Sequence, residues 1–180
     1  RTLGHAACWG WHDLVHGEIR FDASSLGDLV LIKSDGTPAY NFACVIDDHD
    51  MRITHVIRGD DHISNTPKQI LLYEVYAFPA PQFAHLPLIL GQDGAPLSKR
   101  HGAVSLRAFQ EEGFLAEALI NYLALLGWNP GDDQEIFSLD EMIKRFSLSK
   151  VNSNPATFDD PKLRWMNGEH IRALDDAGYR

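Results

Sequence analysis

The sequence has few cysteines, no long apolar run and no excess of basic residues. Its two cysteines, Cys8 and Cys44, form neither a CxxC pair nor a disulfide framework, which suits a reducing cytosol. No apolar run approaches the ~18–20 residues of a membrane-spanning helix, so no membrane partner is expected. Lysine and arginine number 16 against 25 aspartate and glutamate, a formal net charge of −9. That balance argues against binding nucleic acid through bulk charge alone.

The chain also lacks an initiating methionine and the apolar core of a signal peptide, because it begins Arg1-Thr2-Leu3-Gly4-His5. We therefore expect an internal piece of a longer protein. The composition is otherwise ordinary, with 44% hydrophobic and 23% charged residues, which excludes a disordered or collagen-like chain. A chain of 180 residues can bury one sizeable core or two small ones.

The hydrophobic pattern predicts an α/β half followed by a helical half. In the first half, we expect strands at 29–32, 53–58 and 83–90, helices at 40–50 and 64–77, and a turn at 34–38. Residues 1–21 show no clean period. Strand, helix and strand in that order are typical of a parallel α/β unit. Beyond a boundary near Ala103–Ser105, helices are expected at 106–110, 115–126, 139–146 and 161–171. Ser138 and Glu141 form a capping-box pattern before the third of these helices.

A small, locally basic loop between glycines, residues 94–102, stands out in this acidic chain. Lys99 and Arg100 are suited to contact phosphate oxygens, and Ser98 adds a hydroxyl. The alternative is a solvated hairpin tip that carries two charges.

A second polar segment, Arg58-Gly59-Asp60-Asp61-His62, follows a predicted strand. Ligands of open parallel sheets bind at the carboxyl ends of the strands, where Arg58 could grip a carboxylate. The alternative is a surface loop.

Tyr40 follows a tight turn, so its hydroxyl could face a pocket. The alternative is that Tyr40 is simply an aromatic residue of the core. We expect no metal site, because consecutive residues such as 47–50 do not face one another on a helix and the histidines have no zinc-ligand spacing.

Taken together, these segments resemble the glutamyl-tRNA synthetases, which are class I aminoacyl-tRNA synthetases. The resemblance extends from about Asp13 to Ile171 and is carried by the ordered runs at 34–43, 54–62, 66–70, 85–88, 97–102 and 163–168. It implies the second half of a Rossmann-like nucleotide-binding fold followed by an all-α stem-contact region. The implied domains are the end of a connective insertion at 1–28, the catalytic half at 29–104 and the helical region at 105–180. The family's His-Ile-Gly-His-type motif and anticodon-binding region are absent from the 180 residues.

The resemblance also implies an activity. Such an enzyme activates glutamate with ATP and transfers it to tRNA(Glu), and Mg²⁺ is expected to accompany the ATP. We expect the full-length enzyme to be cytoplasmic and monomeric. No zinc site is visible in the 180 residues. The implied catalytic residues are Ser98, Lys99 and Arg100, at the last three positions of a Lys-Met-Ser-Lys-Ser-type loop. Tyr40, Cys44 and Arg58 match the glutamate pocket, although Cys44 receives no chemical role, and Asp61, Leu88 and Lys99 match the ATP site. The loop departs from the family at its first position, which is Pro96.

Three alternatives remain beside this interpretation. One is a paralogue that glutamylates a modified tRNA base, although such proteins usually end soon after the basic loop. Another is a non-catalytic module that keeps the fold and contacts tRNA or another protein. The third is an unrelated nucleotide-binding α/β domain. We expect the 180 residues alone to be inactive, because half of the nucleotide fold is missing from them.

Overall fold

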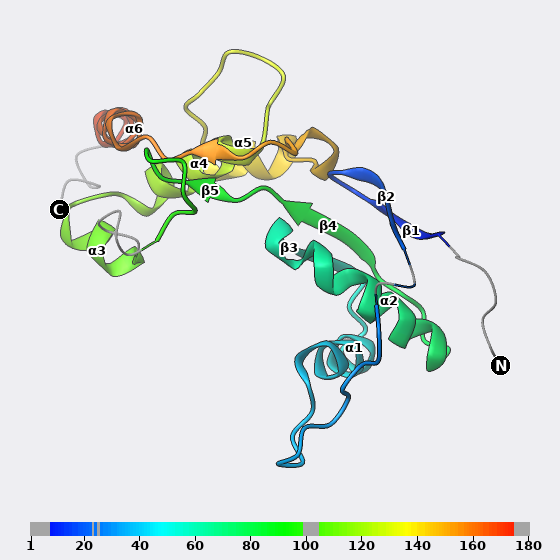
Figure 1. Cartoon of the computed structure of the whole chain (residues 1–180). Helices are drawn as coiled ribbons and strands as arrows, with labels where there is room; N and C mark the ends of the chain where they lie inside the picture. Colours follow the sequence, from blue (N-terminus) through cyan, green and yellow to red (C-terminus); the bar gives the residue numbers. More distant parts are fainter. Residues whose placement is uncertain (1–7, 23, 25, 99–104, 175–180) are drawn as a thin grey trace. The chain divides into compact units, whose positions relative to one another are not determined.

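The computed structural model describes residues 8–22, 24, 26–98 and 105–174. It divides into two compact units, Arg1–Leu86 and Pro87–Arg180, whose elements are labelled in Figure 1. Each unit has a core of its own. Val45, Leu72, Tyr73 and Phe83 form the core of the first unit. In the second unit, one cluster gathers around Tyr122, Leu163 and Met166, and a smaller one around Trp128 and Phe137.

Among the described residues, the sheet of the first unit has strands β1 (Cys8–Asp13), β2 (Gly17–Asp22), β3 (His55–Gly59) and β4 (Gln82–Leu86), in the order β2-β1-β4-β3. The first two form an antiparallel hairpin, and Gly17, at φ 72°, provides the left-handed backbone that its turn requires. β4 runs parallel to both β1 and β3. The hairpin lies in the stretch where the sequence showed no clean period.

Helix α1 (Tyr40–Asp50) has the bounds that the sequence predicted. The predicted second helix is present as α2 (Thr66–Val75), which follows the 3₁₀ helix η2 (Asp60–Asn65) directly. Asn65 is helical, so the chain passes from 3₁₀ to α geometry without a break, with Pro67 in the first turn of α2. The β3–α2–β4 unit is parallel, as predicted.

The predicted strand at 29–32 is wrong. This run pairs with the far side of its own turn: the amide of Ala39 donates to the carbonyl of Leu31 at 2.8 Å, and Ile32 forms an isolated bridge with Pro38. A run that folds back on itself over so few residues contributes no strand to the sheet. Val30 is accordingly 68% exposed.

The predicted strand at 83–90 is divided by Pro87, which has no N–H to donate to a sheet ladder. Its first part is β4, and its second part is β5 (Ile89–Leu90), which pairs in parallel with β6 (Ala156–Thr157). Along the chain, the first compact unit ends at Leu86 and the second begins at Pro87. This division comes before the change in hydrophobic pattern near Ala103–Ser105. The roles expected of 1–28, 29–104 and 105–180 stay predictions.

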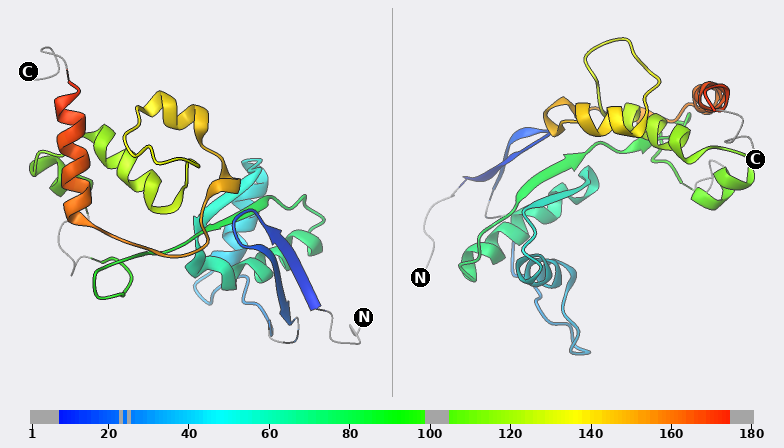
Figure 2. Two further views of the ribbon diagram at one scale, coloured as in Figure 1. Left: turned by 90° about the horizontal axis from the view of Figure 1, so that it is seen from above. Right: turned by 180° about the vertical axis from the view of Figure 1, so that it is seen from behind.

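The second unit contains the predicted helices α3 (Leu106–Glu111), α4 (Ala116–Gly127), α5 (Leu139–Arg145) and α6 (Asp160–Arg172), and the 3₁₀ turn η4 (Leu148–Lys150). Helix α6 packs against α4 through the cluster around Tyr122 (Figure 2). The capping box before α5 is confirmed, because Ser138 and Glu141 hydrogen-bond reciprocally. In the described part of the chain, no helix combines the length and the apolar character needed to cross a membrane.

Candidate functional site

The candidate site lies in the first unit, at the edge where the parallel strands β3 and β4 end. Arg58 on β3 and His85 on β4 are register partners one residue before these strands end. η2 follows β3 immediately and leads into α2, so Thr66 and Gln69 of α2 face the same edge and contact Arg58. This is the edge at which open α/β sheets bind ligands.

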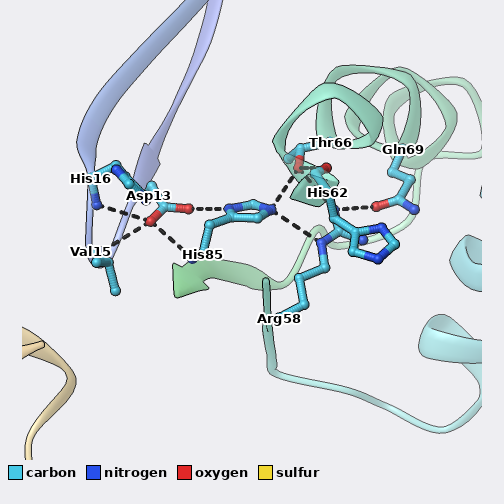
Figure 3. A network of polar contacts seen from close by, with 8 residues as sticks. All are labelled: Asp13, Val15, His16, Arg58, His62, Thr66, Gln69 and His85. Atoms are coloured by element: carbon cyan, nitrogen blue, oxygen red, sulfur yellow. Dashed lines mark hydrogen bonds and ion pairs between the residues drawn. The ribbon is translucent and has the colours of Figure 1, made fainter. Parts of the chain in front are cut away.

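The guanidinium of Arg58 is held by three neighbours (Figure 3). Its Nε–H donates to Nε2 of His85 at 3.1 Å. Nη2 donates to Oγ1 of Thr66 at 2.8 Å and to Oε1 of Gln69 at 2.9 Å. The planar guanidinium therefore has a fixed orientation, which suits recognition of a carboxylate.

Behind Arg58 lies a buried carboxylate–imidazole pair. Nδ1 of His85 is 2.5 Å from Oδ2 of Asp13, and both side chains are fully buried. Burial lowers the pKa of His85. Burial also opposes ionisation of Asp13, but hydrogen bonds from His85 and from backbone amides outweigh it and leave the pKa of Asp13 below its usual value. Asp13 is thus ionised and His85 neutral near pH 7.

Tyr40 and Cys44, one turn apart on α1, lie beside Arg58. Burial raises the pKa of the Tyr40 hydroxyl, its hydrogen bond with the Cys44 thiol adds to this, and the nearby Arg58 guanidinium acts in the opposite direction. The side chain of Tyr40 is still half exposed, at 51%. The structure therefore brings together the three residues that the resemblance placed in a glutamate pocket.

Asp61 reaches this group through His62. Nε2 of His62 is 3.9 Å from a carboxylate oxygen of Asp61, and its Nδ1 is 3.5 Å from the hydroxyl of Tyr40. Asn65 donates to the same Nδ1 at 3.2 Å. A polar chain thus connects the start of α1 with η2, and Asp61 stands at its exposed end.

The remaining predicted site residues are not in the first unit. Leu88 lies between β4 and β5, and Ser98 follows a hairpin in which the amide of Leu97 donates to the carbonyl of Ile89 at 2.8 Å. Pro96 forms an isolated bridge with Leu90 in this hairpin. Lys99 and Arg100 lie outside the described residues.

Sequence reasoning missed the groups that orient Arg58. Asp13 lies on β1, and Thr66 and Gln69 lie on α2; like His85, the two α2 residues were quoted only as parts of motifs. The available signal was Pro87, because a proline interrupts a strand and so places His85 near the end of the strand that begins close to Phe83. The residues of the acidic run 47–50 differ in their exposure. Asp47 and Asp50 are exposed, whereas Asp48 is half-buried, and burial raises the pKa of Asp48.

Two cations of α6, Lys162 and Arg164, are already paired with carboxylates. Lys162 lies 2.5 Å from Glu135, and Arg164 contacts Asp160 at 2.6 Å and Glu112 at 2.9 Å. Neighbouring carboxylates thus offset both charges, and the structure provides no support for a basic patch on α6. Among the described residues, no group of three histidine, cysteine, aspartate or glutamate side chains is arranged to hold a metal ion.

A family model described as tRNA synthetases class I (E and Q), catalytic domain, matches residues 5–165. The chain belongs to this family, and its mixed α/β fold with a parallel sheet agrees with that membership.

Individual proteins similar to this chain are named glutamate–tRNA ligases. The glutamate–tRNA ligase of Aquifex aeolicus (strain VF5) is 59% identical over 165 residues, which are 91% of this chain and 35% of that protein. That of Sulfurihydrogenibium sp. (strain YO3AOP1) is 56% identical over 166 residues, 92% of this chain and 35% of that protein. A crystal structure of a glutamate tRNA ligase from Elizabethkingia meningosepticum CCUG26117, in complex with its amino acid, matches with a TM-score of 0.86 and 40% identity, over 94% of this chain and 37% of that one. The chain thus spans about a third of these relatives' length.

Proposed function

We propose that this chain is part of a glutamate–tRNA ligase and supplies part of its glutamate-binding site. The observation that carries the proposal is the fixed guanidinium of Arg58 beside Tyr40 and Cys44, at the carboxyl edge of a parallel sheet. The names of the relatives support the same substrate, and one solved relative is described as a complex with its amino acid.

In the first step, a carboxylate oxygen of glutamate attacks the α-phosphorus of ATP, and pyrophosphate leaves. Arg58 holds a carboxylate of the amino acid, and the Tyr40 hydroxyl helps to orient it. Asp61 and the backbone at Leu88 contact ATP, and Ser98, Lys99 and Arg100 stabilise the charge that develops on the leaving pyrophosphate. Mg²⁺, if bound with ATP, would offset part of the charge of its phosphates.

In the second step, a hydroxyl of the terminal adenosine of tRNA(Glu) attacks the activated carbonyl, and AMP leaves. Neither step requires a nucleophile from the protein, so this chain contributes positioning and electrostatic stabilisation. We place the complete enzyme in the cytoplasm as a monomer. The interpretation of 97–102 as a Lys-Met-Ser-Lys-Ser-type loop belongs to the same proposal.

Lys99 provides the sharpest test of the loop. In the complete enzyme that contains this chain, Lys99→Ala should reduce glutamate-dependent exchange of pyrophosphate into ATP, with tRNA present, by about 10²–10³-fold. The loss follows because one preorganised cation no longer meets the leaving pyrophosphate. Lys144→Ala is the matched control, because Lys144 is exposed on α5. A near-normal exchange rate for Lys99→Ala would remove Lys99 from the mechanism.

A further inference from the structure

The hydrogen bonds of Arg58 divide its donors into two sets. A guanidinium has five N–H donors. Three of them are used inside the protein: one on Nε toward His85, and two on Nη2 toward Thr66 and Gln69. These three partners do not use the two donors of Nη1, and the Tyr40 hydroxyl is a further neighbour of the guanidinium. The donors that face a ligand are therefore determined by the partners of Nε and Nη2.

The bond between Arg58 and His85 determines the tautomer of the imidazole. The Nε of arginine is always a donor, so Nε2 of His85 must act as the acceptor and carries no proton. The hydroxyl of Thr66, 3.1 Å from the same Nε2, is compatible with that role. The single proton of the neutral ring is therefore on Nδ1, where it is donated to Oδ2 of Asp13.

Asp13 is itself held rigidly. Its Oδ1 accepts the backbone amides of Val15 at 3.0 Å, His16 at 3.1 Å and His85 at 3.2 Å, which leaves Oδ2 directed at the imidazole. The first two amides belong to the turn of the β1–β2 hairpin, and the third belongs to β4. The hairpin is thus connected to Arg58 through one carboxylate and one imidazole, both fully buried.

We propose that Asp13 and His85 are positioning residues for amino-acid recognition: Asp13 holds His85 in the tautomer that accepts from Arg58, and His85 thereby aims Arg58 at the substrate carboxylate. This inference rests on the proposed function, since it assigns Arg58 to the bound glutamate. It gives the hairpin a role in the site through the buried side chain of Asp13.

Asp13→Asn tests the proposal without a change in side-chain volume. The amide oxygen can still accept the three backbone N–H groups, but an amide N–H then points at Nδ1 of His85. The imidazole must move its proton to Nε2, where it opposes the Nε–H of Arg58. In the complete enzyme, the KM for glutamate in pyrophosphate exchange should rise about tenfold or more, because a charge-assisted hydrogen bond is lost. The KM for ATP should change less than about twofold.

Two His85 variants separate the two hydrogen bonds of the ring. The amide of Gln reaches about as far as Nε2, so His85→Gln can still accept from Arg58. The amide of Asn reaches only as far as Nδ1, so His85→Asn can still contact Asp13 but not Arg58. The KM for glutamate should therefore be lower in His85→Gln than in His85→Asn. Glu18→Gln is the matched control, since this exposed carboxylate contacts His12 at 3.1 Å on the same hairpin and has no connection to Arg58.

The outcomes separate this inference from the proposed function. If the unaltered enzyme shows no glutamate-dependent exchange, the proposed function fails. If it is active and Asp13→Asn keeps the original KM for glutamate, or lowers only the melting temperature and the fraction of active enzyme, the pair has a merely structural role and the inference is wrong. Equal KM values for glutamate in His85→Gln and His85→Asn would also overturn the inference. This comparison remains decisive if Asp13→Asn does not fold.

Discussion

Arg58 depends on its neighbours for the direction in which it presents its charge. A guanidinium on a flexible stem loses side-chain entropy on ordering, and here that loss occurs before a ligand arrives, because Thr66, Gln69 and His85 already hold the group. Preorganisation of this kind increases affinity without adding a contact to the ligand. It requires that His85 stay neutral, which connects the site to pH.

Protonation of His85 predicts how stability depends on pH. Because burial lowers the pKa of His85 below 6.5, the unfolded chain binds a proton that the folded chain does not, and stability falls as the pH drops from about 6.5 toward the folded pKa. The lowered pKa of Asp13 adds a further loss below about 3.8. The melting temperature should thus fall between about pH 7 and pH 5.

His85→Gln should reduce that fall, because glutamine does not titrate. His12→Gln is the matched control, since the side chain of His12 is 65% exposed on the same hairpin. Melting curves at several pH values provide the measurement. The same fall in His85→Gln as in the unaltered protein would contradict the assignment to His85.

At the scale of elements, two adjacent segments place the site. The β3–α2–β4 unit brings Arg58 and His85 to one edge, and the β1–β2 hairpin adds Asp13 to it. The hairpin packs closely at Gly10, where an added Cβ would lie 2.7 Å from the backbone carbonyl oxygen of Ile19. The strand pair therefore depends on the absence of a side chain at this position.

Gly10→Ala should destabilise the fold by about 1–3 kcal/mol, because the paired backbone must shift. The same change at Gly168 should have the opposite sign. Gly168 is inside α6, where an added Cβ would meet only the end of the Arg172 side chain at 3.6 Å, so Gly168→Ala should stabilise by about 0.5–1 kcal/mol. Urea unfolding followed by circular dichroism measures both. Equal effects of the two substitutions would contradict the account of the hairpin.

The sequence predicted local elements better than it predicted long-range partners. Helix α1, the parallel β3–α2–β4 unit and the helices of the second unit follow from periodicity and capping. The pairing of 89–90 with 156–157 could not be predicted, because two residues per strand carry no period. Tyr40, Cys44 and Arg58 were named through family motifs, whereas the bond between Asp13 and His85 joins residues 72 positions apart, and no local pattern marks it.

At the scale of the whole molecule, the net charge limits how this chain could contact the proposed partner, tRNA. With a net charge of −9, the proposed contact with tRNA would have to come from local groups. On α6, Lys162 and Arg164 are paired with carboxylates. In the basic loop, Lys99 and Arg100 lie outside the described residues. We infer that much of the tRNA surface lies in other parts of the complete enzyme.

The 180-residue chain by itself should not support pyrophosphate exchange with glutamate, even with tRNA present. It contains no His-Ile-Gly-His-type motif, and the nucleotide fold needs that half for the ATP site. Exchange by the purified chain, at a rate above a sample without glutamate, would show that these residues suffice. The complete enzyme, assayed in parallel, is the positive control.

In the proposed function, the site around Arg58 serves glutamate activation. The most direct measurement is pyrophosphate exchange by the complete enzyme, with tRNA and ATP present, when glutamate, glutamine or aspartate is the only amino acid supplied. We expect exchange with glutamate and little exchange with glutamine or aspartate. Exchange that depends on glutamine or aspartate instead, or no exchange with any of the three, would contradict it.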